Sequence, residues 1–154
     1  MRRIAGALAL WGLLICSCGR EGTVWTRSVT FDDGRWEGDE RIVFSPDSAA
    51  LESGEARNLV YSIRYGTDAS VDAFPMVAEK ISPDDPDAKA DTLNVRLLPA
   101  GERTANKSRL GVFEVYDTIP LTIPAAPGWE VSFRLAGEGT ALNGIYSLTI
   151  ELTK

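Results

Sequence analysis

Apolar and polar residues alternate along much of the chain with the two-residue period of β-strands. The clearest runs are Arg57–Tyr65, Trp129–Leu135 and Ile145–Leu152. No stretch repeats apolar residues with the period of an amphipathic helix. Together with segments rich in β-branched and aromatic residues, this pattern predicts about eight strands. They are expected over 23–31, 41–44, 57–65, 71–81, 92–98, 112–123, 129–135 and 145–152.

Two proline-bearing segments, Phe74–Pro75 and Ile119–Pro127, mark the expected edges of the sheets. Proline has no N–H to donate to a ladder, so within sheets it occurs at edges and bulges. The run 71–81 is therefore expected at an edge or a bulge. The run 112–123 is expected along an edge or crossing between sheets. Such edges could accept a strand from a partner.

Polar stretches separate the predicted strands. Residues 82–91 and 100–109 are expected to be exposed hairpin connections. Residues 48–56 have room for a short helix, which Gly54 weakens. Many short strands with regular turn signals are typical of a β-sandwich or a barrel. We therefore expect an all-β fold, a single jelly-roll-like β-sandwich of about eight strands.

The first residues are expected to be a targeting segment. Arg2 and Arg3 precede the apolar run Ile4–Ile15. That run matches the ~7–15 residues of a signal-peptide core and is shorter than the ~20 residues of a membrane-spanning helix. An ordinary secretory signal is one interpretation.

The residues that follow resemble the lipobox of bacterial lipoproteins. Cys18 has Ser17 directly before it and Ile15 at position −3, whereas Cys16 would directly follow Ile15. The resemblance implies cleavage before Cys18 and a lipid on its sulfur. A disulfide between Cys16 and Cys18 would be strained, because one residue separates them. The chain would then consist of a signal peptide (1–17), a lipidated tether (18–22) and a β-sandwich domain (23–154).

Composition narrows the chemistry. The formal charge is −6, and loss of Arg2 and Arg3 would make the domain more acidic still. An acidic domain repels phosphate backbones, so nucleic acid is not an expected partner. The chain has no histidine, the commonest general base and transition-metal ligand. Without a Gly-x-Ser-x-Gly motif or a cysteine pair in the domain, we expect neither an enzyme nor a bound cofactor.

Acidic and aromatic residues leave weaker alternatives open. Four aspartates could coordinate calcium, although their spacing differs from an EF-hand and a solvated loop is commoner. Carboxylates around Trp36 could serve sugar hydrolysis, although a surface turn is commoner. Three tryptophans on different strands could stack on a glycan or pack in the core. The aspartates considered for calcium are Asp84, Asp85, Asp87 and Asp91. The carboxylates around Trp36 are Asp32, Asp33, Glu37, Asp39 and Glu40. The tryptophans considered for stacking are Trp25, Trp36 and Trp129.

Four short motifs follow one another along the domain. They are Asn58–Arg64 (NLVYSIR), Asp91–Leu93 (DTL), Gly111–Asp117 (GVFEVYD) and Leu142–Ile145 (LNGI). Over Trp25–Leu152 the chain thereby resembles the GldH family of gliding-motility lipoproteins from the Bacteroidota. It departs from the family pattern in two places. Residues 67–74 replace a tyrosine-rich segment, and 136–140 shorten the stretch before the last motif.

This resemblance implies a non-enzymatic envelope protein, held on a membrane by lipid on Cys18. Its partners would be other envelope lipoproteins and gliding or secretion machinery. No acidic run follows Cys18, so the periplasmic face of the outer membrane is favoured. A glycan- or surface-binding lipoprotein of the same architecture is the alternative. Three tripeptides resemble the O-glycosylation motif of this phylum, which makes Ser48, Thr92 and Thr118 candidate acceptors.

Overall fold

The computed structural model describes residues 22–47, 51–105, 111–137 and 139–154. The predicted signal peptide, Cys18 and Ser48 lie outside the described residues. In the described ranges, no helix has the length and apolar character needed to cross a membrane.

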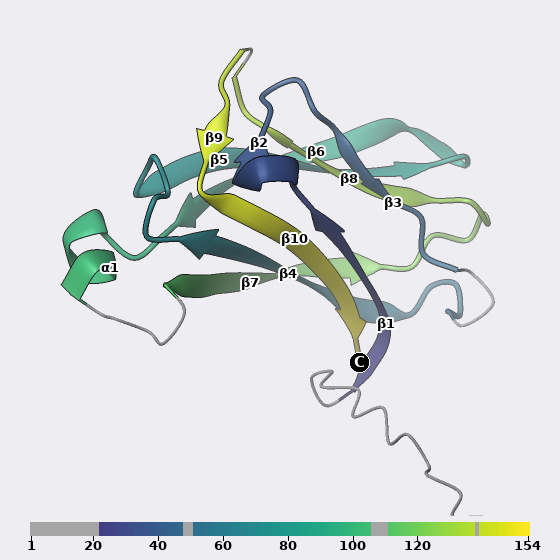
Figure 1. Cartoon of the computed structure of the whole chain (residues 1–154). Coiled ribbons are helices and arrows are strands. Elements are labelled where there is room, and N and C mark those ends of the chain that lie inside the picture. The colour runs from purple at the N-terminus through teal and green to yellow at the C-terminus, as the bar shows by residue number, and fades with distance from the viewer. Residues whose placement is uncertain (1–21, 48–50, 106–110, 138) are drawn as a thin grey trace, which may run out of the picture.

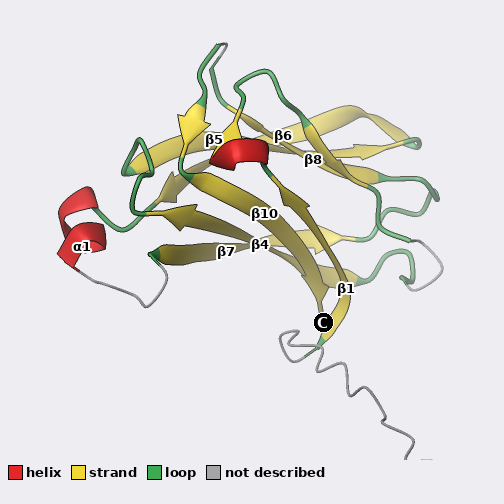
Figure 2. Cartoon of the chain, viewed as in Figure 1, coloured by secondary structure: helices red, strands yellow, loops and turns green. Residues whose placement is uncertain are grey.

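The described residues form two stacked β-sheets with very little helix (Figure 1, Figure 2). Sheet I has the strand order β1-β10-β4-β7, and sheet II has the order β3-β8-β5-β6. A separate two-residue pair joins β2 and β9. The strands are β1 (Thr23–Thr30), β2 (Arg35–Trp36), β3 (Ile42–Phe44), β4 (Ala56–Gly66), β5 (Ala73–Ser82), β6 (Asp85–Arg96), β7 (Val112–Thr122), β8 (Glu130–Leu135), β9 (Leu142–Asn143) and β10 (Ile145–Thr153). The helical elements are the 3-10 turn η1 (Asp32–Gly34) and the helix α1 (Ala100–Ala105).

The strand order is that of a jelly roll. When the strands of the two large sheets are counted in chain order, sheet I reads 1-8-3-6 and sheet II reads 2-7-4-5. Neighbouring strands pair antiparallel throughout. This arrangement builds two Greek keys into one double-sheet sandwich. The prediction of an all-β, jelly-roll-like sandwich is confirmed.

Alternation along the strands places the core between the sheets. In β4, Leu59, Tyr61, Ile63 and Tyr65 are buried on the inner face, as their spacing predicts. Trp36 and Trp129 are 0% and 1% exposed, so both lie fully in the core. Aromatic rings pack against one another there. The closest stacked pair is Phe31–Trp36, with ring centroids 4.9 Å apart, and Phe74 meets Trp36 edge-on at 6.3 Å.

The expectation that Phe74–Pro75 lies at a sheet edge is wrong. Strand β5 lies inside sheet II, between β8 and β6. The Pro75 carbonyl accepts a hydrogen bond from Ala136 N (3.0 Å), so the backbone nitrogen of residue 75 faces the β8 side too. The paired register with β8 begins only at Met76–Leu135. Proline therefore removes only the reciprocal hydrogen bond between Pro75 and Ala136, at the end of the β5–β8 ladder.

The stretch 82–91 is also not the predicted hairpin loop. Ser82 already pairs with Asp85, so residues 83–84 alone turn the chain between β5 and β6. The polarity of this stretch indicates solvent exposure correctly. It does not indicate a loop, because an edge strand exposed to solvent can be polar and still pair through its backbone.

The stretch 100–109 is not a hairpin connection either. Its first part forms α1, and residues 106–110 lie outside the described ranges. The connection joins β6 in sheet II to β7 in sheet I, so it crosses between sheets. The expected short helix over 48–56 is absent from its described residues 51–56, and β4 begins at Ala56.

Candidate functional site

The two longest edge strands lie on the same side of the sandwich. β7 is an edge of sheet I, and β6 is an edge of sheet II. Five apolar residues on these strands pack against the core but remain half-buried. We call them the edge groove: Leu93 on β6, and Phe113, Val115, Ile119 and Leu121 on β7. All five have odd residue numbers, and side chains alternate between the two faces of a strand. All five therefore lie on the inward faces, along the opening between the sheets.

A cavity of about 250 Å³ opens at one end of the edge groove. Its apolar wall includes Leu59, Ala78, Ile119, Leu121 and Val131, drawn from both sheets. Charged residues of both signs also line it: Glu79, Lys80, Lys89 and Asp91. An apolar floor with a charged border is the usual anatomy of a protein-binding surface.

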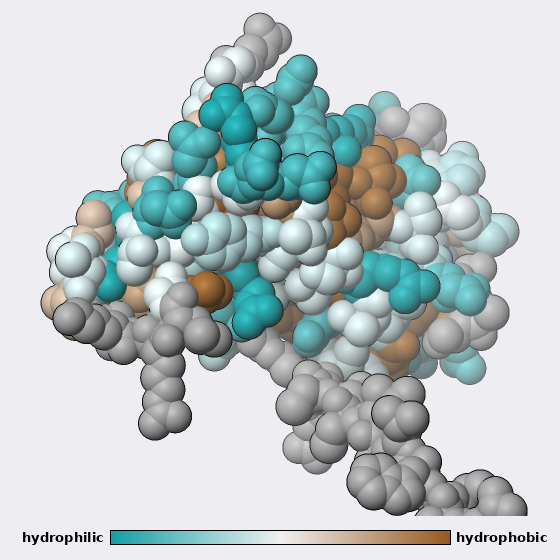
Figure 3. Space-filling model, in the orientation of Figure 1, coloured by the Kyte–Doolittle hydropathy of each residue, from teal (hydrophilic) through white to brown (hydrophobic). Residues whose placement is uncertain are grey.

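The opposite side of the sandwich has shorter edge strands. There the edges are β1 and β3, and β3 has only three residues. The buried Trp25 closes part of this side, and the Arg27 guanidinium lies 5.8 Å from its ring centroid. Figure 3 shows mostly hydrophilic and neutral residues over β1 and β10, with a hydrophobic patch beside them toward β3 and β8. The side with the edge groove is therefore the stronger candidate for a binding site.

Asp117 stands beside Tyr61 where β4 and β7 pair. Burial raises the pKa of the Tyr61 phenol, and the negative charge of Asp117 raises that pKa further. Because the pKa is raised in the folded state, the contribution of Tyr61 to stability is full below about pH 10, the unfolded pKa. That contribution is lost as the pH rises through the folded pKa.

Asp117→Asn should therefore lower the pKa of Tyr61 while burial keeps it above that of a free tyrosine. The measurement is an ultraviolet titration of tyrosinate, with Tyr61→Phe identifying the Tyr61 step. Glu114→Gln is the matched control, since Glu114 lies on the outer face of the same strand. An unchanged Tyr61 titration in Asp117→Asn would show that Asp117 does not act on this ring.

Two of the three candidate modification sites, Thr92 and Thr118, lie within the described residues. Thr92 and Thr118 are both exposed, on the outer faces of β6 and β7. They lie within edge strands and not in loops. Asp91, which precedes Thr92, instead lines the cavity. The structure therefore leaves both hydroxyl groups accessible.

The acidic residues form no group that could hold a metal ion in the described part of the chain. No three Asp, Glu or Cys side chains converge there to hold an ion. Asp84 serves the β5–β6 turn: Ser82 Oγ donates to one carboxylate oxygen, and Ala126 N donates to the other (3.3 Å). The Ser82 hydrogen bond lowers the pKa of Asp84. Asp32 and Asp33 are exposed in η1.

The tryptophans do not form the stacking platform considered as an alternative. Trp25, Trp36 and Trp129 are all buried in the core. Trp36 also donates its indole N–H to the Glu40 carbonyl at 3.5 Å, which keeps its polar atom inside the fold. A glycan site would need other residues.

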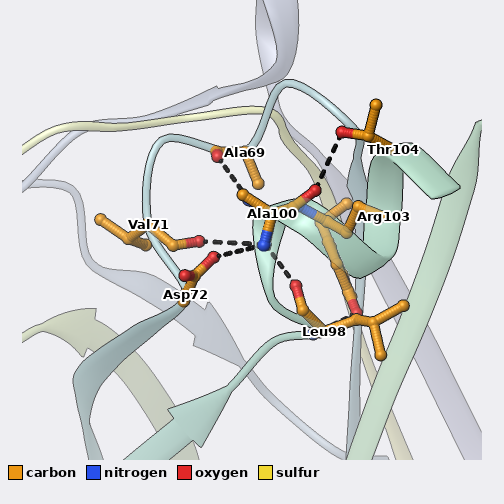
Figure 4. A network of polar contacts seen from close by, with 8 residues as sticks. Ala69, Val71, Asp72, Leu98, Ala100, Arg103 and Thr104 are labelled. Carbon is orange, nitrogen blue, oxygen red and sulfur yellow. Dashed lines mark hydrogen bonds and ion pairs between the residues drawn. The ribbon is translucent and has the colours of Figure 1, made fainter.

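A buried arginine fastens the end of the sandwich that carries α1 (Figure 4). The side chain of Arg103 is 1% exposed, while that of its ion-pair partner Asp72 is 57% exposed. Arg103 Nη2 donates to the Ala69 carbonyl (2.9 Å). Its Nη1 donates to Asp72 Oδ1 (3.0 Å), to the Val71 carbonyl (3.4 Å) and to the Leu98 carbonyl. The sequence carries no signal for this role, since Arg103 lies in a stretch of solvent-exposed character.

Comparisons with known proteins add little. No family model matches the chain, and no curated protein matches it either. Among solved structures, it resembles part of dimeric latent PorU from Porphyromonas gingivalis, at 11% identity and a TM-score of 0.34, over 86% of this chain and 13% of that one. It also resembles part of a Clostridium thermocellum xylanase 10B with CBM22-1 and GH10 modules, at 10% identity and a TM-score of 0.40, over 86% and 28% of the two chains. The chain thus spans less than a third of either protein. Similarity this low gives no information about the function of this chain.

Proposed function

We propose that this protein is a lipid-anchored, non-enzymatic component of the cell envelope that binds a partner protein through the edge groove. The edge groove is the observation that supports this proposal most directly. Five half-buried apolar side chains lie along two adjacent edge strands, where folded proteins usually shield their edges. Covering this stripe with a partner would stabilise the complex, because it removes apolar surface from water.

The start of β1, which the predicted anchor precedes in the chain, lies at the same end of the molecule as the cavity. Across sheet I, Thr23, Thr153, Asn58 and Pro120 stand side by side in one row. Pro120 also lines the cavity. The start of β1 and the C-terminus meet at this anchor end, and α1 lies at the far end (Figure 1).

A lipid on Cys18 would therefore hold the cavity close to the membrane. The five residues 18–22 reach at most about 18 Å when fully extended. Several acyl chains on one cysteine make a stable anchor, whereas a single chain binds weakly. A partner attached to the same membrane would then meet the groove at a high effective concentration.

The resemblance to the GldH family supports a narrower proposal about the partners. They would be envelope lipoproteins of gliding or secretion machinery, at the periplasmic face of the outer membrane. The alternative of a glycan-binding lipoprotein has less support, because the described tryptophans are buried and offer no stacking surface.

Affinity purification from cross-linked membranes tests the proposal. The full-length chain should co-purify with other envelope proteins after gentle detergent extraction. An unrelated lipoprotein carrying the same leader and residues 18–22 is the control, because it shares the anchor and lacks the domain. Recovery of the same proteins with both baits, or of the chain alone, would contradict a partner-binding role.

A further inference from the structure

We propose that the partner contributes a β-strand to the free edge of β6, between Ala90 and Arg96. The segment it contributes is extended and has an apolar residue at every second position. This inference rests on the proposed function, since it specifies how the edge groove is occupied. It follows from the direction of the backbone groups on the two edge strands and from the side chains between them.

The backbone of β6 presents alternate groups to solvent. Leu97 N donates to the Asp72 carbonyl (2.9 Å), just beyond the paired residues Ala73 and Arg96. Odd-numbered residues at this end of β6 therefore direct their backbone groups toward β5. The even-numbered residues direct theirs away from the sheet: Ala90, Thr92, Asn94 and Arg96. The register here is regular, and the shift between Lys80 and Ser82 lies nearer the turn.

The edge of β7 is closed to the same kind of pairing over its second half. Ile123 N donates to the Glu55 carbonyl (2.9 Å), so odd residues here face β4 and even residues face outward. Of the outward groups, Thr118 N already donates to the Asp117 carboxylate (2.8 Å), and Pro120 has no N–H. Over this half of the opening, an entering strand is therefore directed to β6.

A strand beside β6 would extend sheet II across the opening between the sheets. Its inward side chains would then lie over Leu93 and the apolar residues of β7, which are half-buried without it. Its outward side chains would continue the row of Thr92, Asn94 and Arg96, which are exposed and carry one positive charge. The segment should therefore be apolar at alternate positions and neutral or acidic between them.

The test uses the mature lipidated chain in nanodiscs and a displayed library of random short peptides. Selected peptides should show the alternating pattern. Thr92→Pro removes one outward N–H without breaking the β5–β6 ladder. It should lower the affinity for a selected peptide roughly tenfold or more. Ile119→Lys, which places a charge in the groove, should do the same. Thr118→Lys is the matched control, because it makes the same change one residue away on the opposite face.

Hydrogen exchange distinguishes strand addition from other binding. The bound peptide should protect the amides of Thr92 and Asn94, while that of Leu93 is already bonded within the sheet and changes little. Selected peptides that bind Thr92→Pro and Ile119→Lys as tightly as the parent would overturn the proposal, as would a failure to select any. A dimer of this chain that Thr92→Pro disrupts would overturn it as well, because the occupant would then be a second copy. Partners that co-purify despite a negative peptide result would leave the proposed function standing and assign it to another surface.

Discussion

Arg103→Ala is expected to lower the free energy of unfolding by about 3 kcal/mol or more. The substitution removes every donor that the guanidinium supplies to the carbonyls of Ala69, Val71 and Leu98. These acceptors face a side chain that solvent hardly reaches, so water replaces the lost hydrogen bonds poorly. Urea unfolding of the purified protein, followed by tryptophan fluorescence, measures the change.

Two control variants separate hydrogen bonding from volume and from charge. Arg103→Met keeps most of the side-chain volume but donates no hydrogen bond, so it should remain strongly destabilising. Asp72→Asn should cost about 1 kcal/mol or less, because the Asp72 carboxylate is largely exposed and its ion pair is screened by solvent. Equal stability of Arg103→Ala and the parent would show that Arg103 does not hold α1 to the sandwich.

The alternating runs of the sequence predicted most of the fold. In β4, one face of the strand is apolar and buried, and the register follows from that face. The proline at position 120 indicated an edge strand correctly. The proline at position 75 did not, because its missing N–H falls just past the last pair with β8. Local sequence cannot show where a neighbouring strand ends.

The candidate site was only half visible in the sequence. The apolar positions of β7 and its proline predicted an exposed edge. The matching edge of β6 begins within an acidic, proline-containing stretch that reads as a loop. Its place depends on the jelly-roll strand order, which brings β6 and β7 to the same side of the molecule. Arg103 was invisible for a similar reason: burial by a tertiary contact leaves no periodic pattern.

The predicted anchor and the edge groove would act together. The proposed binding edge lies near the point where the chain enters sheet I. The lipid predicted on Cys18 would keep that edge at a membrane. Without the lipid, the same domain would not be held at the membrane, and its half-buried apolar stripe would not be kept near a partner there.

Cys18→Ser should release the processed chain from the membrane almost completely, because serine cannot carry the thioether lipid. The domain should still fold, since the described core residues all lie between Trp25 and Leu152, after Cys18. The measurement is membrane fractionation of cells producing the parent or Cys18→Ser, with mass spectrometry of the N-terminal peptide. The parent chain should begin at a lipid-modified Cys18 in the membrane fraction, and the Cys18→Ser chain should be absent from that fraction once its leader is removed. A leaderless Cys18→Ser chain that remains membrane-bound, or a parent chain with an unmodified Cys18, would contradict this prediction.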